Sequence, residues 1–182
     1  MYIIIFLICF ADAWISTVIM GRQSKAFFTM GTVRKPFSIF DLEFPASPVS
    51  AANLLLGIGL LGEEAALKVK RALRGQLYVD FLFMPGVYVG ILILCRGAAL
   101  KTGHWPGTFF CALAYLQLLA WLLDITENLI LLSLIKRPRP FSQGQFKAYG
   151  FMELFKWGLP LIGFACASST LLYFWITGSY FV

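Results

Sequence analysis

The sequence predicts an all-α integral membrane protein: a bundle of four transmembrane helices with short amphipathic helices in the first loop. Of its 182 residues, 59% are hydrophobic and only 13% are charged, whereas soluble domains carry about 25% charged residues. Its apolar runs match the roughly 20 residues that a helix needs to cross the hydrocarbon core. Because only helices and closed barrels satisfy their backbone hydrogen bonds in lipid, and the runs do not alternate as barrel strands do, helices are the prediction.

The apolar runs define one transmembrane domain over residues 1–182. We expect an extramembrane loop at 21–76 and spans at about 2–20, 77–95, 107–135 and 149–176. The first span is expected to be a retained anchor helix, because no basic segment precedes it as in a signal peptide.

The first loop contains two segments with helical patterns. Ser47-Pro48 predicts the start of a short helix that ends at about Leu56. Glu63 to Arg74 predicts a second helix, lying along the membrane surface and leading into the second span.

Small residues within the spans predict close helix packing. Gly86 and Gly90 have the small-x-x-x-small spacing in the second span, and Gly163 and Ala167 repeat it in the fourth. We therefore expect neighbouring helices to approach closely at these residues.

The lysine and arginine counts of the loops predict an orientation. Eight lie in the first loop and four in the third, against two in the second. Because loops on the inner side carry the excess of these residues, we expect the first and third loops in the cytoplasm or matrix. Both termini would then lie in the periplasm or intermembrane space, and the membrane would be a bacterial cytoplasmic or mitochondrial inner membrane.

Charged side chains inside the spans are the strongest candidates for function, because each costs several kcal/mol unless it is paired or hydrated. They are Asp12, Asp80, Asp124, Glu127, Glu153 and Lys156. With a rise of about 1.5 Å per residue, they fall in the inner half of the membrane, and Asn128 shares the helix face of Asp124. We expect one intramembrane polar cluster, formed by Asp12, Asp80, Asp124, Glu127, Asn128 and Lys156.

Two interpretations of this cluster stay open. In the favoured one, Lys156 pairs with Asp124, Glu127 or Asp80, and the cluster fixes the register of the helices. In the other, the surplus of carboxylates over one lysine forms a proton or cation site, or an acid/base pair.

The sequence gives no sign of established catalytic chemistry. It contains no Ser/His/Asp set, P-loop or GxGxxG motif, so no catalytic residue is assigned. The lone His104 falls at the opposite membrane face from the carboxylates, so we expect no metal site and no cofactor.

Basic residues beside the spans predict binding of anionic lipid headgroups, such as those of cardiolipin. The candidates are Arg34, Lys35, Lys136, Arg137 and Arg139. No basic stripe interleaves with aromatic residues, so we do not expect nucleic acid as a partner. The cysteines are expected to be small buried hydrophobic residues, although a disulfide between Cys95 and Cys111 stays open.

Four short segments of the sequence resemble motifs of a known protein family. They are Tyr78-Val79-Asp80-Phe81-Leu82-Phe83, Leu123-Asp124-Ile125-Thr126-Glu127-Asn128, Phe155-Lys156 and Asp41-Leu42-Glu43-Phe44. Together they resemble an uncharacterised family of small four-helix integral membrane proteins, mostly bacterial, with D-F-x-F and D-x-x-E-N motifs. The resemblance covers most of the chain. It implies that Asp80, Asp124, Glu127, Asn128 and Lys156 belong to one site, but the family has no assigned activity to carry over.

Our leading hypothesis is that the chain is an accessory or structural subunit of a multisubunit membrane complex, such as an energy-transducing complex of the respiratory type. Its spans would pack on helices of other membrane subunits, and its inner loops would bind anionic lipid. The first alternative is a small proton or cation transporter or channel that uses the carboxylate cluster. The second is a lipid-modifying enzyme, although the missing catalytic motifs favour a protein that is not an enzyme.

Overall fold

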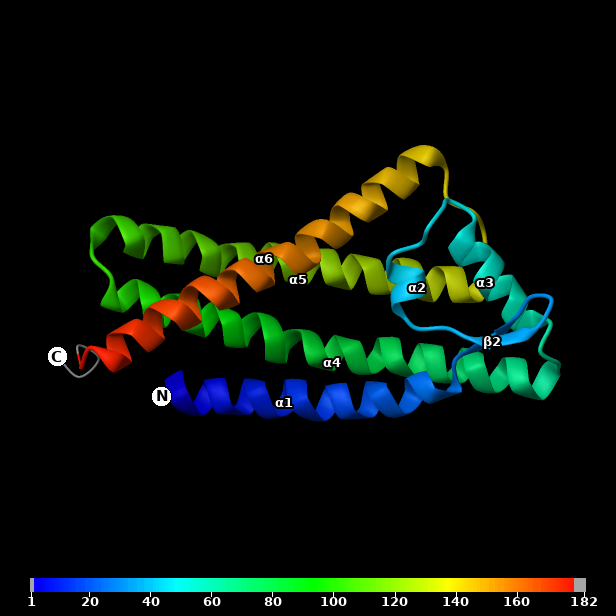
Figure 1. The fold of residues 1–182 in the computed structure, drawn as a ribbon, viewed down its shortest axis with the longest axis horizontal. Helices are drawn as coiled ribbons and strands as arrows, with labels where there is room; N and C mark the ends of the chain where they lie inside the picture. Colours follow the sequence, from blue (N-terminus) through cyan, green and yellow to red (C-terminus); the bar gives the residue numbers. More distant parts are fainter. Residues whose placement is uncertain (1, 179–182) are drawn as a thin grey trace. The chain divides into compact units, whose positions relative to one another are not determined.

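A computed structural model describes residues 2–178 of the chain, which are mostly helical (Figure 1). The long helices are α1 (Tyr2–Gln23), α4 (Glu63–Lys101), α5 (His104–Lys136) and α6 (Gln143–Ile176). Between α1 and α4 lie the 3-10 turn η1 (Ser24–Ala26), the strands β1 (Phe28–Met30) and β2 (Arg34–Pro36), and the short helices α2 (Phe40–Glu43) and α3 (Ser50–Gly59).

Within the described residues, four helices are long and apolar enough to cross a membrane, and they are α1, α4, α5 and α6. Their most apolar windows have mean hydropathies between 1.6 and 2.4. The predicted fold class, an all-α membrane bundle with short helices in the first loop, is therefore confirmed.

The first loop differs from the expectation in two ways. Residues 63–74 do not form a separate helix but are the first turns of α4, which continues without interruption to Lys101. Gly75 does not break the helix. It lies instead where the side chain of Gln23 packs, so that a Cβ at this residue would lie 2.9 Å from the Gln23 Nε2 atom. The second difference is the antiparallel pair β1–β2, in which Phe28 lies opposite Pro36 and Met30 opposite Arg34.

The chain forms two compact units, to which each long helix contributes a part. The first unit comprises the chain up to Trp14, Phe83–Asp124, and the chain from Leu154 on. Its core is formed by apolar side chains of α4, α5 and α6, among them Ile91, Cys95, Phe110 and Ala167.

Close approach between helices in the first unit occurs at the predicted glycines. A Cβ at Gly86 would lie 2.8 Å from the Cys9 carbonyl oxygen, and a Cβ at Gly90 would lie 3.5 Å from Cys9 Cβ. A Cβ at Gly163 would meet the Gln117 side chain at 2.6 Å. The small residues thus let α1 approach α4, and α5 approach α6.

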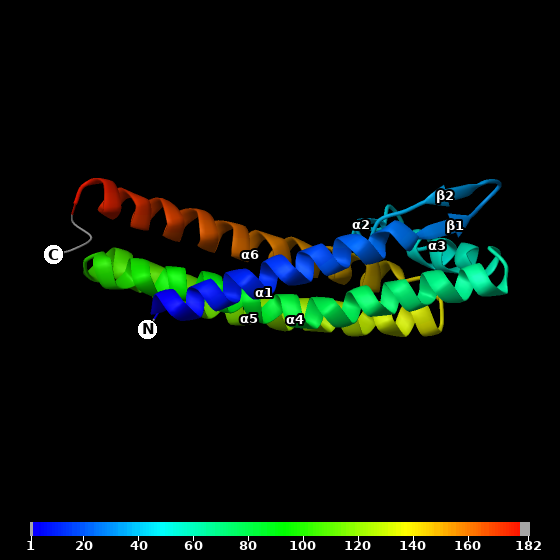
Figure 2. The same ribbon diagram turned by 90° about the horizontal axis from the view of Figure 1, so that it is seen from below.

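The second unit comprises Ile15–Leu82 and Ile125–Glu153. Its larger core joins α2 and α3 to α4 and α5 through buried residues such as Leu42, Ile58, Leu73 and Leu131. Figure 2 shows the β1–β2 pair beside α3, where Thr29 Oγ1 donates a hydrogen bond of 2.8 Å to the Leu54 carbonyl. The first loop is therefore packed as part of a core, rather than lying as an independent segment.

Candidate functional site: buried polar networks

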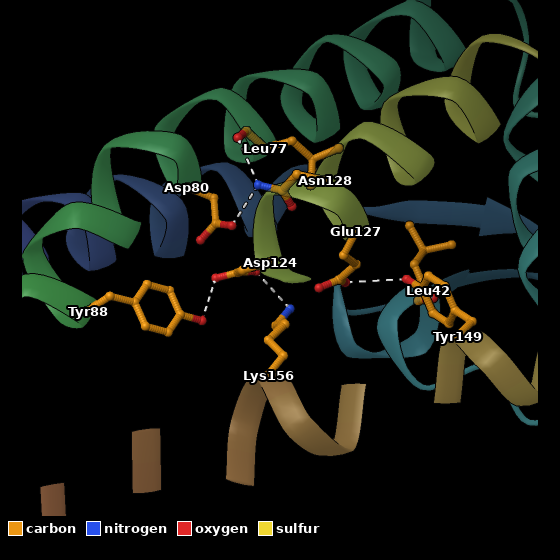
Figure 3. A network of polar contacts seen from close by, with 9 residues as sticks. All are labelled: Leu42, Leu77, Asp80, Tyr88, Asp124, Glu127, Asn128, Tyr149 and Lys156. Carbon is orange, nitrogen blue, oxygen red and sulfur yellow. Dashed lines mark hydrogen bonds and ion pairs between the residues drawn. The ribbon is translucent and has the colours of Figure 1, made fainter. Parts of the chain in front are cut away.

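The only lysine among the buried residues of the described chain forms an ion pair in the first unit. Lys156 Nζ on α6 lies 3.1 Å from Asp124 Oδ1 on α5, and the two side chains are 5% and 6% exposed. Tyr88 on α4 donates a hydrogen bond of 2.9 Å to the other carboxylate oxygen of Asp124 (Figure 3). The pairing with Asp124 is one of the three that the sequence left open for Lys156.

Aromatic rings flank this ion pair. The ring of Tyr88 stacks on that of Trp121, with centroids 6.5 Å apart, and Lys156 Nζ lies 5.4 Å from the centroid of Trp157. Apolar surroundings strengthen the attraction between the charges but also make their desolvation costly. The hydroxyl of Tyr88 offsets part of that cost by donating to the carboxylate.

A second polar contact joins α4 to α5 in the second unit. The buried side-chain amide of Asn128 donates to Asp80 Oδ2 at 2.7 Å and to the Leu77 carbonyl at 3.4 Å (Figure 3). Hydrogen bonds to a carboxylate are among the strong ones, and this contact links residues of two neighbouring helices.

A group of three glutamates lies in the second unit, and we call it the carboxylate cluster: Glu43 of α2, Glu127 of α5 and Glu153 of α6. One carboxylate oxygen of each lies within 4.8 Å of those of the others. Glu127 and Glu153 are completely buried, and Glu43 is half-buried.

Tyr149 adds a hydroxyl group to the carboxylate cluster. Its O–H lies 3.3 Å from Glu127 Oε1 and 3.4 Å from the Leu42 carbonyl oxygen, so it can donate to either (Figure 3). Because Leu42 is completely buried in the core, it anchors the short helix α2 and brings the adjacent Glu43 to α5. On α6, Tyr149 and Glu153 are one turn apart and therefore share a helix face.

The carboxylate cluster can bind protons or a hard cation. Carboxylate, hydroxyl and carbonyl oxygens are the ligands that Ca²⁺ and Mg²⁺ prefer in proteins. Three carboxylates at this separation repel one another when all are charged, and a proton or a cation between them relieves the repulsion.

The structure brings several of the predicted site residues into contact within each unit. Asp124 and Lys156 pair in the first unit, whereas Asp80 and Asn128 pair in the second. Glu127 meets Glu43 and Glu153 in the carboxylate cluster. Asp12 is half-buried on α1, and its Oδ2 lies 2.8 Å from where a Cβ at Gly86 would be.

Sequence reasoning did not include Glu43, Glu153, Tyr88 and Tyr149 in the site. Glu153 was identifiable as a charge inside a span, and Glu43 falls in the Asp41-Leu42-Glu43-Phe44 segment of the resemblance. No sequence signal distinguishes Tyr88 and Tyr149 from the other tyrosines. Their hydroxyl groups matter only because helix rotation points them at carboxylates.

The predicted lipid-binding residues lie at two places in the second unit. Arg34 and Lys35 are exposed on β2, where the Arg34 guanidinium lies 4.4 Å from the centre of the Phe28 ring. Lys136, Arg137 and Arg139 are exposed around the end of α5. A further basic hollow of about 700 Å³, which the sequence did not predict, is lined by Arg22, Lys68 and Arg71.

The cysteines are free thiols, including Cys95 and Cys111. Cys95 is buried in the first core, and Cys111 Sγ accepts a hydrogen bond of 3.4 Å from Arg96. The side chain of His104 lies outside the described part of the chain.

Comparison with known proteins adds no functional information. No protein-family model, curated protein or solved structure matches this chain.

Proposed function

We propose that this chain is a small integral membrane transporter or channel that takes up and releases protons or hard cations at its carboxylate cluster. The observation that carries the proposal is the meeting of Glu43, Glu127 and Glu153, from three separate helices, with carboxylate oxygens within 4.8 Å. Ionisable groups inside membrane helices are costly and commonly mark ion pathways and proton relays.

The balance of buried charge supports this proposal. Among the described residues, the buried ionisable side chains that carry charge in their ordinary state are Asp124, Glu127, Glu153 and Lys156. Three acids thus stand against one base, and burial of a net negative charge in an apolar medium is unfavourable. Uptake of protons or of a cation at the cluster compensates this surplus.

The test is ion flux into liposomes that contain the purified full-length protein. We expect Glu127→Gln and Glu153→Gln to reduce proton or cation flux at least to a tenth, because each removes one carboxylate from the cluster. Glu64→Gln is the matched control, since Glu64 is exposed on α4, and its flux should equal that of the native protein. Thermal unfolding of each variant separates loss of function from loss of fold.

Two outcomes would oppose the proposal. If the native protein gives no flux above empty liposomes for protons, Na⁺, K⁺, Mg²⁺ or Ca²⁺, the chain does not transport these ions. If the two buried variants unfold at lower temperature and retain flux, the glutamates serve the fold alone.

A second candidate function is that of an accessory subunit in a larger membrane complex, such as one of the respiratory type. Only 11% of the most apolar window of α1 is buried within the chain, and Ile4, Leu7 and Ile8 are more than half exposed. Helices of another subunit would cover this face. If the protein extracted from its native membrane in mild detergent migrates alone at its monomer mass, this candidate fails.

We also propose that the basic first and third loops lie in the cytoplasm or matrix and both termini on the opposite side, in a bacterial cytoplasmic or mitochondrial inner membrane. The excess of lysine and arginine in these two loops supports this orientation. A reporter fused to the C-terminus, active only outside the cytoplasm, should be active; an inactive reporter on a correctly inserted protein would reverse the orientation.

A further inference from the structure

A groove opens between the last turns of α5 and the first turns of α6, within the second unit. Its volume is about 440 Å³, and sites for small molecules span roughly 300–1,000 Å³. Its apolar wall includes Leu129, Ile130 and Met152. Leu129 is 57% exposed, so the groove is open to the surroundings of the helices.

Polar groups that suit an anion lie in the same groove. Arg139 and Gln145 are exposed and line it. Gln145 belongs to the first turn of α6, where it forms a reciprocal capping box with Ser142: the Ser142 N–H donates to Gln145 Oε1 at 3.0 Å, and the Gln145 N–H donates to Ser142 Oγ at 3.3 Å. The positive end of the α6 dipole and the Arg139 guanidinium therefore both favour a negative charge here.

A long apolar wall together with a cationic group is complementary to an anionic amphiphile. Because the chain has four candidate membrane spans, the amphiphile that surrounds it is phospholipid. Lys136 and Arg137 precede Arg139 in the chain and add further positive charge, which favours an anionic headgroup over a zwitterionic one.

We propose that the groove holds one anionic phospholipid, with its phosphate at Arg139 and one acyl chain along Leu129, Ile130 and Met152. The phosphate accepts hydrogen bonds from the planar guanidinium, which matches phosphate geometry. The acyl chain removes the exposed apolar surface of the groove from contact with the rest of the bilayer. This binding does not depend on ion transport by the carboxylate cluster.

The test is lipid retention by the full-length protein in mild detergent, measured by native mass spectrometry. Phosphatidylglycerol and phosphatidylcholine with the same acyl chains are the probes. We expect one phosphatidylglycerol molecule to be retained, with roughly tenfold preference over phosphatidylcholine, and R139Q to lower that retention by roughly tenfold. K147Q is the matched control: it also removes one positive charge near the start of α6, but exposed Lys147 does not line the groove. We expect its retention to stay within twofold of the native value.

A second variant tests the apolar part of the site. Ala148 lines the groove and is exposed on α6, so A148F fills the groove while Arg139 stays in place. We expect it to lose the retained lipid as R139Q does.

Two results would overturn the proposal. Equal losses in R139Q and K147Q would mean that a diffuse basic surface, and not the groove, attracts the lipid. Native retention in A148F, with an unchanged unfolding midpoint, would mean that the acyl chain does not occupy the groove.

Discussion

Tyr149 contacts Glu127 of the carboxylate cluster and also belongs to the groove between α5 and α6. Its hydroxyl lies 3.3 Å from Glu127 Oε1, and the residue is one of those that line the groove. The ring also lies against Phe141, with centroids 5.1 Å apart. One residue thus contacts the carboxylate cluster with its polar end and the proposed lipid site with its apolar body, as tyrosine side chains can.

Tyr149→Phe should separate these two roles. The change removes the hydroxyl group that contacts Glu127 but keeps the aromatic ring of the residue that lines the groove. We expect ion flux in liposomes to change by a factor of at least three, while retention of phosphatidylglycerol stays within twofold of the native value. A variant that loses the lipid and keeps its flux would contradict both assignments.

The ion pair between Asp124 and Lys156 should show strong energetic coupling. Removal of one partner leaves a buried charge without its main compensation, so Asp124→Asn and Lys156→Met should each lower the free energy of unfolding by about 3 kcal/mol. We expect the double variant to be at least about 1 kcal/mol more stable than the sum of the single effects predicts. Unfolding in mixed micelles with increasing denaturing detergent provides the measurement.

The matched control for this cycle is the pair Glu64 and Lys68 on α4. Both side chains are exposed and lie four positions apart on a helix. Exposed pairs of this kind couple by about 0.5 kcal/mol or less. Equal coupling in the two cycles would mean that burial contributes nothing to the Asp124–Lys156 interaction.

Gly86→Ala should destabilise the packing of α1 on α4. The new Cβ would lie 2.8 Å from the backbone oxygen of Cys9, and a backbone atom cannot rotate away as a flexible side chain can. We expect a loss of about 1–3 kcal/mol in the free energy of unfolding.

Gly158→Ala is the control for this helix contact. A Cβ at Gly158 would meet no atom within 4 Å, so alanine should stabilise α6 by up to about 1 kcal/mol through its higher helix propensity. If Gly86→Ala and Gly158→Ala change the free energy of unfolding in the same direction, the close approach at Gly86 does not determine the effect of its substitution.

Asn128→Leu should weaken the contact between α4 and α5 in the second unit. The change removes an amide that donates to Asp80 and to the Leu77 carbonyl, and hydrogen bonds between membrane helices contribute about 0.6–2 kcal/mol. We expect Asn128→Leu to lower the free energy of unfolding by about 1 kcal/mol. The control is Asn53→Leu on the exposed face of α3, which should change it by less than about 0.5 kcal/mol. If Asn128→Leu is as stable as the native protein, the contact does not contribute to helix register.

The sequence by itself determined the class of the fold and the approximate location of the spans, because the free energy of placing a helix in lipid depends mainly on local composition. It also identified Lys156 and Asp124 as members of a buried polar group, since charges inside apolar runs are visible without coordinates. The start of α4 was less predictable. Residues 63–74 have the amphipathic pattern of a surface helix, yet they pack through Ala66, Val69 and Leu73 into the core of the second unit.

Only the tertiary structure decided which acids meet. Glu43 is 84 residues from Glu127 along the chain, and the two come together because burial of Leu42 anchors α2 in the core. Likewise, the rotation of α6 turns Tyr149 and Glu153 towards Glu127, while Lys156, further along the same helix, pairs with Asp124. Such contacts depend on loop paths and on how helices rotate when they pack, and these follow from the sum of many side-chain interactions rather than from any local pattern of residues.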